Sequence, residues 1–160
     1  SISLRKKVKP KLDFNLKLVK LKREKPQFKN LKYKKILSYL SKMDNSKSDI
    51  ALVSNKKILE TGTSNLLFVK NQKFFTPKKD YYEGNTYKFF KTKIKRIGKK
   101  DILLKELNDY DEILLIGSGK GVTSVRTINE LNWKRKNLNK FKFLSNQYNA
   151  AINECDPYRF

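Results

Sequence analysis

The 160-residue sequence contains no histidine and a single cysteine, Cys155. A lone cysteine cannot form a disulfide within the chain, and without histidine the usual zinc, haem and iron–sulfur ligand sets cannot be assembled. The same absences exclude a Ser/His or Cys/His catalytic pair. We therefore expect no metal site, and any chemistry must use Lys, Asp, Glu, Ser, Thr or Tyr side chains or a bound cofactor.

Long apolar runs are also missing. No stretch approaches the roughly 20 apolar residues of a membrane-spanning helix, and no apolar signal-peptide core follows the basic first ten residues. We therefore expect no membrane association and a cytoplasmic location. A chain with 38% hydrophobic and 12% aromatic residues should nevertheless fold around a core. Neither a repeat nor a linker divides it, which predicts one domain over residues 1–160.

Acidic residues are scarce, because 15 Asp and Glu stand against 38 Lys and Arg, for a formal net charge of +23. Such a surplus would suit the phosphates of nucleic acid. However, lysine outnumbers arginine 32 to six and occurs in nearly every segment, whereas base-reading sites favour the forked arginine side chain. A genome-wide codon bias toward A and T explains the same composition. We therefore do not expect nucleic acid as a partner, although a non-catalytic basic nucleic-acid-associated or structural protein remains an alternative.

Hydrophobic periodicity in the first half of the chain indicates both strands and helices. Strict alternation over residues 11–18, with Leu12 on the apolar side, predicts a half-buried strand. A polar loop over 22–27 precedes helical spacing that begins near Lys29 and fades after Met43. Four short β runs separated by turn residues then predict a meander or hairpins, with the runs at 50–53, 57–60, 66–69 and 73–76.

The second half continues the mixed pattern. Apolar residues at helical spacing after Gly84 predict a helix that Gly98 terminates. Three more strands are predicted at 102–104, 112–116 and 122–128. A helical turn is predicted at Leu107, and a last helix over 138–152. The sequence thus predicts a mixed α and β (α+β) fold of short, mostly antiparallel strands with about three flanking helices.

Three places break the pattern of core and solvated lysine. Residues 117–121 (GSGKG) follow a strand, and their small side chains would let backbone N–H groups approach an anion, unless they form only a tight turn. Residues 84–86 (GNT) stand where a helix should begin, and its free N–H groups suit a phosphate as well as ordinary capping. Glu60 ends a β run before a polar turn, where it is either a functional acid or a solvated one.

In their order along the chain, these motifs resemble class IV pyridoxal-phosphate enzymes. The run ETGTSNLLF over 60–68 looks like the family signature. The other matching segments are FKNL at 28–31, TP at 76–77, GNT at 84–86 and DEILLIGSGKGVTSV at 111–125. The resemblance covers about residues 22–152, with 1–21 as a leading strand region and 153–160 as a tail. It implies the large C-terminal domain of the D-amino-acid aminotransferase-like fold and pyridoxal 5′-phosphate as cofactor.

The resemblance also implies roles for individual residues. Lys29 matches the catalytic lysine that forms a Schiff base with the cofactor, a role that needs a lowered pKa to supply a neutral amine. Glu60 matches the carboxylate that pairs with the pyridine nitrogen and helps the ring to accept electrons. Asn85 and Thr86 match the backbone donors that hold the cofactor phosphate.

Three further matches complete the implied cofactor site. Ser118 matches a hydroxyl donor to the same phosphate, with Gly119 contributing its backbone, and Tyr82 falls where the family packs a side chain on the cofactor ring. The chain departs from the family at Tyr87, where an arginine is common, and at Lys32, where an asparagine is common.

The family includes branched-chain and D-amino-acid aminotransferases and 4-amino-4-deoxychorismate lyase, so a small-molecule amino substrate and a homodimer are implied. The GSGKG loop and the short lysine motif look more like the lyase, which forms 4-aminobenzoate and pyruvate for folate synthesis, and a class IV aminotransferase is the alternative. The resemblance provides no counterpart here for the family's smaller N-terminal domain. A fragment of this kind would be inactive if catalysis needs that domain.

Overall fold

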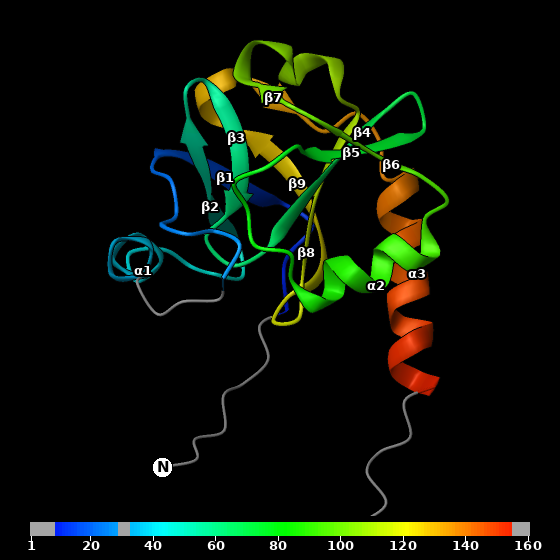
Figure 1. Cartoon of the computed structure of the whole chain (residues 1–160). Helices are drawn as coiled ribbons and strands as arrows, with labels where there is room; N and C mark the ends of the chain where they lie inside the picture. Colours follow the sequence, from blue (N-terminus) through cyan, green and yellow to red (C-terminus); the bar gives the residue numbers. More distant parts are fainter. Residues whose placement is uncertain (1–8, 29–32, 155–160) are drawn as a thin grey trace, which may run out of the picture.

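A computed structural model describes residues 9–28 and 33–154 as ten strands, three α-helices and two 3₁₀ turns (Figure 1). The elements are, in order, β1 (Phe14–Lys20), α1 (Lys34–Leu40), β2 (Ser48–Ser54), β3 (Lys57–Thr61), β4 (Asn65–Lys70), β5 (Lys73–Pro77), α2 (Asn85–Lys93), β6 (Ile97–Lys100), β7 (Ile102–Leu103), η1 (Leu104–Asp109), β8 (Glu112–Gly117), β9 (Gly121–Ile128), η2 (Asn129–Leu131), β10 (Trp133–Lys134) and α3 (Asn139–Glu154).

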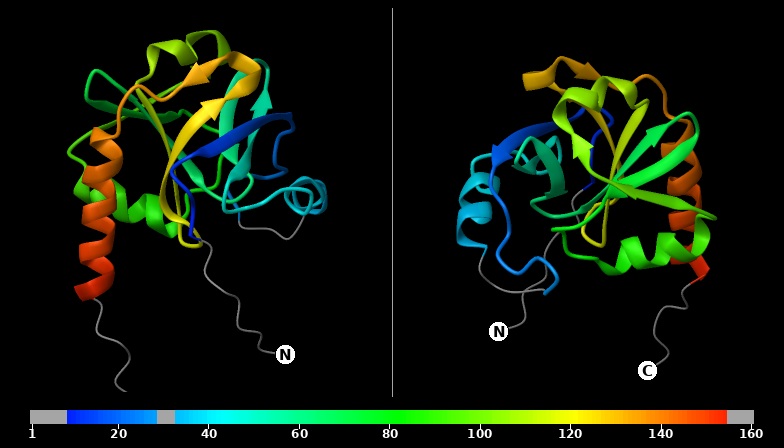
Figure 2. Two further views of the ribbon diagram at one scale, coloured as in Figure 1. Left: turned by 180° about the vertical axis from the view of Figure 1, so that it is seen from behind. Right: turned by 45° about the horizontal axis from the view of Figure 1, so that its top comes forward.

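The strands form one sheet in the order β6-β5-β4-β8-β9-β1-β2-β3-β7, with β10 paired to β9. Strands β1 and β2, β1 and β9, and β5 and β6 run parallel, whereas the other pairings are antiparallel. The sheet curls so that its two halves face each other, while α2 and α3 lie on one outer side and α1 on another (Figures 1 and 2). This confirms the predicted mixed α and β fold with mostly antiparallel strands and three flanking helices.

Alternate residues of the central strands feed different hydrophobic clusters, because successive side chains of a strand point to opposite faces. On β8, Ile113 and Leu115 enter the cluster enclosed by the curled sheet, whereas Leu114 and Ile116 pack beneath α2 and α3. The same division on β2 gives a third cluster under α1. Burial on both faces explains why the sequence shows continuous apolar runs at these strands instead of alternation.

Two hairpins close through turns of one kind. Asn55 and Lys56 join β2 to β3, and Asn71 and Gln72 join β4 to β5, all four with φ between 49° and 63°. A positive φ at both central residues matches the twist of the flanking strands, and asparagine tolerates it better than most residues. The hairpins predicted from the short β runs are therefore confirmed.

The predicted helix end at Gly98 is wrong. Helix α2 stops at Lys93, Ile94 is already extended, and Ile97 and Gly98 belong to β6, which pairs with β5. The apolar spacing continued past the helix because Ile94 and Ile97 contact the same cluster as the helix does. Gly98 serves close packing instead of capping, since a Cβ there would lie 2.8 Å from the Phe75 ring.

The ends of the chain's first two elements also differ from prediction. Strand β1 begins only at Phe14, and Leu12, predicted on the apolar side, is 57% exposed. The described helix α1 covers Lys34–Leu40, shorter than the predicted three to four turns, whose beginning near Lys29 falls outside the described residues. The remaining predicted strands, the turn at Leu107 and the last helix are confirmed to within two or three residues at their ends.

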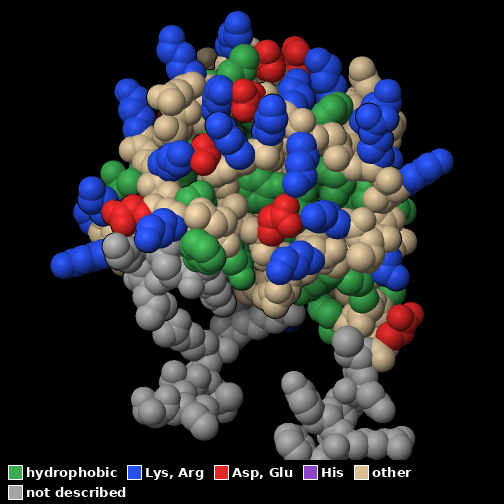
Figure 3. Space-filling model, viewed as in Figure 1, with side chains coloured by type: hydrophobic (Ala, Val, Ile, Leu, Met, Phe, Trp, Pro, Cys, Tyr) green, Lys and Arg blue, Asp and Glu red, His purple; other side chains and the backbone are tan. Residues whose placement is uncertain are grey.

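Lysine and arginine side chains are spread over the face shown in Figure 3, between neutral and apolar surface, without gathering into one stripe. On this face, therefore, they outline no track for a nucleic-acid backbone. Of the helices in the described part of the chain, none is both long and apolar enough to cross a membrane.

Candidate functional site

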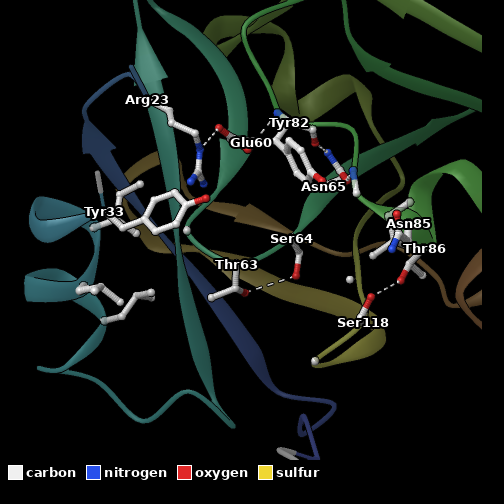
Figure 4. Close-up of a pocket in the computed structure, with 18 residues that line it drawn as sticks. Arg23, Tyr33, Glu60, Thr63, Ser64, Asn65, Tyr82, Asn85, Thr86 and Ser118 are labelled. Carbon is white, nitrogen blue, oxygen red and sulfur yellow. Dashed lines mark hydrogen bonds and ion pairs between the residues drawn. The ribbon is translucent and has the colours of Figure 1, made fainter. Parts of the chain in front are cut away.

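A cavity of about 340 Å³ lies where α1, the turn after β3, the beginning of α2 and the β8–β9 turn meet (Figure 4). This volume is within the range of small-molecule sites. Six of the seven predicted site residues line it, namely Glu60, Tyr82, Asn85, Thr86, Ser118 and Gly119. Lys29 lies outside the described residues, so its predicted catalytic role stays a prediction. The structure thus brings together residues that are up to 59 positions apart in the sequence.

Glu60 is a buried acid, not a solvated loop residue. Its side chain is 4% exposed, and its Oε1 accepts a hydrogen bond from Arg23 Nε at 2.7 Å. Its Oε2 accepts the backbone N–H of Tyr82 at 3.3 Å. Burial raises the pKa of the Glu60 carboxyl, and the Arg23 charge and these hydrogen bonds oppose that rise. A desolvated carboxylate held by a cation at a cavity wall is typical of a functional group.

Arg23 was missed by the sequence reasoning, which assigned it to a polar loop. Its side chain is 8% exposed, and its guanidinium lies 4.6 Å from the ring centroid of Tyr33, which also lines the cavity. This stacking fixes the guanidinium plane while Nε reaches Glu60. The rarity of arginine beside 32 lysines was the available signal, because forked pairing with a carboxylate is a task that lysine performs less well.

The opposite wall of the cavity carries hydrogen-bond donors. The residue before α2, Gly84, offers no side-chain cap, so the first N–H groups of the helix, at Asn85 and Thr86, have no partner within it. The hydroxyl of Thr86, in the first turn of α2, lies 3.2 Å from the hydroxyl of Ser118 in the β8–β9 turn. Free N–H groups at a helix start together with two hydroxyls form a suitable site for an anion.

Asn65 fixes the beginning of α2, and the sequence reasoning gave it no role of its own. Its Nδ2 donates to the backbone oxygen of Tyr82, and its Oδ1 accepts the N–H of Gly84 at 3.0 Å. Since a Cβ on Gly84 would lie 3.1 Å from the same Oδ1, the approach is close. The asparagine of the Ser64-Asn65 pair therefore orients the segment that carries the donor groups.

Figure 4 shows Glu60 and Arg23 toward one side of the hollow and Thr86 and Ser118 toward the other. The site therefore offers a carboxylate at one side and donors for an anion at the other. Within residues 9–28 and 33–154, no three Asp, Glu, His or Cys side chains gather as a metal ion would require.

Solved structures with the same fold include enzymes of two kinds. The 4-amino-4-deoxychorismate lyase of Pseudomonas aeruginosa has a TM-score of 0.71 at 17% identity, over 91% of this chain and 56% of that one. The branched-chain amino acid aminotransferase of Thermobaculum terrenum, in its pyridoxal-phosphate form, gives 0.75 at 17% identity, over 90% and 52%. The branched-chain aminotransferase of Thermoproteus uzoniensis, solved with norvaline, has a TM-score of 0.75 at 16% identity, over 89% of this chain and 52% of that one.

These matches establish the fold, and the chain spans a little more than half the length of each of these structures. No curated protein is a detectable relative by sequence. The family model for amino-transferase class IV, however, matches residues 3–128, which include β1 to β9 and every predicted site residue. The chain therefore belongs to the class IV aminotransferase family.

Proposed function

We propose that this chain is the cofactor-binding large domain of a pyridoxal-phosphate-dependent enzyme that acts on a small amino substrate. The observation that carries the proposal is the cavity itself, in which a buried Glu60 and a donor group at Thr86 and Ser118 share one hollow. The family's enzymes depend on this cofactor, and one solved relative of the same fold is in its pyridoxal-phosphate form.

The described residues fit the two ends of pyridoxal phosphate. The phosphate would lie at the beginning of α2, where backbone N–H groups that have no partner within the helix and two hydroxyls can donate to it. Glu60 would accept a hydrogen bond from the protonated ring nitrogen, because a carboxylate in a desolvated wall pairs well with a pyridinium. Tyr82, on the wall between these groups, would pack against the ring.

When bound, the cofactor supplies an electron sink for the α-carbon of an amino substrate. Glu60 would stabilise the protonated ring nitrogen on which that sink depends, and the Arg23 guanidinium beside Oε1 favours the ionised form of Glu60 by opposing the rise in pKa that burial causes. Lys29 would anchor the cofactor and then accept and return the α-proton as a general base and acid. Ile36 and Leu40 of α1 give one side of the hollow an apolar wall, which would limit the access of water to a bound molecule on that side.

We assign the reaction to the 4-amino-4-deoxychorismate lyase type, with 4-aminobenzoate and pyruvate as products in folate synthesis. The short lysine motif and the GSGKG loop support this choice. The alternative is a class IV aminotransferase for branched-chain or D-amino acids, since relatives of both kinds share the fold.

One coupled assay separates the two reactions. Formation of 4-aminobenzoate from aminodeoxychorismate supports the lyase, whereas glutamate-dependent turnover of a branched-chain 2-oxo acid supports the aminotransferase. Because the family has a smaller N-terminal domain, each assay is run on the chain alone and on the chain supplied with such a domain. Analytical ultracentrifugation of both samples tests the homodimer that we also propose.

Binding of the cofactor is tested separately from turnover. Titration of the chain with pyridoxal phosphate should give visible absorption that Glu60→Gln weakens. A chain that gives no such change, but binds RNA or DNA with an affinity that falls steeply with salt, would instead support the basic nucleic-acid-associated alternative.

A further inference from the structure

Lys120 stands in the middle of the GSGKG loop, yet its ammonium does not face the cavity. Its side chain is 6% exposed, and Nζ lies 3.0 Å from Oδ2 of Asp49, whose side chain is completely buried. Nζ also lies 5.1 Å from the Phe14 ring centroid. Lys120 is therefore a buried cation paired beneath the loop, and it does not line the cavity as Ser118 and Gly119 do.

Asp49 collects contacts from the turn that follows Glu60. Its Oδ2 accepts hydrogen bonds from the hydroxyl of Thr63 and, at 3.3 Å, from that of Thr61. Its Oδ1 accepts the N–H of Ile50 at 2.7 Å. A single buried carboxylate thus binds both the 61–65 turn and, through Lys120, the 117–121 loop.

The two loops also touch each other directly. A Cβ on Gly117 would lie 2.7 Å from Oγ of Ser64. Gly62 of the turn packs against Asp49 of β2 as well, since a Cβ there would lie 3.0 Å from its Oδ1. The turn is closed internally, since the Thr61 hydroxyl accepts the N–H of Ser64 at 2.8 Å. These contacts mean that a displacement of one loop requires a displacement of the other.

We propose that the buried Asp49–Lys120 ion pair is a positioning element that holds the 117–121 loop against the 61–65 turn, so that Ser118 and Gly119 face the anion site. Gly119, at the centre of the loop, would meet nothing within 4 Å if it carried a Cβ, so its own packing does not fix its position. A buried ion pair contributes little net stability, but it specifies one arrangement of the segments that carry its members. The functional half of this inference rests on the proposed function, and the structural half does not.

The structural half is tested by hydrogen exchange of the protein without cofactor. Lys120→Met should increase amide exchange in both peptides, 61–65 and 117–121, although they are far apart in the sequence. The double variant Asp49→Asn/Lys120→Met leaves no unpaired buried charge, so its thermal midpoint should return toward that of the wild type while both peptides still exchange faster. Faster exchange in only one peptide, or in neither, would overturn the proposal, as would recovery of wild-type exchange in the double variant.

The functional half is tested by calorimetric titration with two probes, pyridoxal phosphate and pyridoxal. The double variant should bind pyridoxal phosphate about tenfold more weakly, which is the loss expected for one misplaced charge-assisted hydrogen bond. Its affinity for pyridoxal, which has no phosphate, should be unchanged. Lys57→Met is the matched control, because Lys57 pairs with Asp101 at 2.6 Å and does not line the cavity. Equal weakening for both probes would refute positioning of the anion site. A wild-type chain that binds neither probe would contradict the proposed function, and the exchange experiment would still decide on the ion pair.

Discussion

Removal of Arg23 should destabilise the protein in a way that depends on pH. The substitution Arg23→Met leaves Glu60 buried at 4% exposure without the cation that now contacts it at 2.7 Å. Breaking a buried pair by removing one partner costs about 3–5 kcal/mol in the free energy of unfolding, because an uncompensated charge stays desolvated. We expect a loss of that size at about pH 8, where Glu60 is ionised in the unfolded chain.

The loss should shrink on acidification. Burial already raises the pKa of Glu60, and removal of Arg23 takes away the largest opposing cause, so the pKa rises further. Between its ordinary value and this raised value, the folded variant holds a proton that the unfolded chain has lost. The free energy of unfolding therefore falls as pH rises through that window, and the variant loses the least stability at the acidic end of the window.

Urea unfolding at about pH 5 and about pH 8 measures this difference for four proteins. These are the wild type, Arg23→Met, Glu60→Gln and the double variant. The double variant should show a smaller loss with no extra pH dependence, because neither charge is present. An equal loss for Arg23→Met at both pH values would refute the reasoning, since it would mean that the arginine acts through packing and not through the charge of Glu60.

Three further predictions concern the cofactor and the last helix. Lys29→Ala should abolish the visible absorption that pyridoxal phosphate produces with the wild type, and absorption that survives unchanged would mean that another lysine is the reactive one. Ser118→Ala should weaken pyridoxal phosphate binding about tenfold in calorimetry, with little effect on pyridoxal, because only the phosphate loses a donor. Glu112→Ala should lower the free energy of unfolding by about 1–3 kcal/mol in urea titrations, since the buried carboxylate accepts the N–H groups of Lys140 and Phe141, at 2.8 and 2.9 Å, where α3 begins. A Glu112→Ala protein as stable as the wild type would show that these bonds are not needed.

The sequence predicts those parts of the fold that depend on local rules. The turns at Asn55 and Asn71 were identifiable because asparagine accepts the positive φ that such hairpins require. The strands around them follow from short apolar runs. Gly98 shows the limit of this reasoning, because the same residue type serves a helix end or a close contact, and only the position of Phe75 decides between them.

The candidate site divides in the same way. Glu60, Thr86 and Ser118 belong to an ordered set of motifs, so their common cavity was predictable from the family pattern. Arg23 and Asp49 were not, because their partners lie 37 and 71 residues away and no periodicity links such positions. Pairing of this kind is set by the strand order, in which β1 lies between β9 and β2 and β3 follows β2.

Helix α3 lies beyond residue 128, where the match to the family model ends, and lines no part of the cavity. It nevertheless touches both ends of the hairpin that carries Ser118. Glu112, at the beginning of β8, receives the first N–H groups of α3, and the Tyr148 ring lies 2.9 Å from the place where a Cβ on Gly121 would stand. A truncation that removed this helix would therefore remove contacts that support the anion-binding turn on the side away from the cavity. It would do so without deleting any residue that lines the cavity.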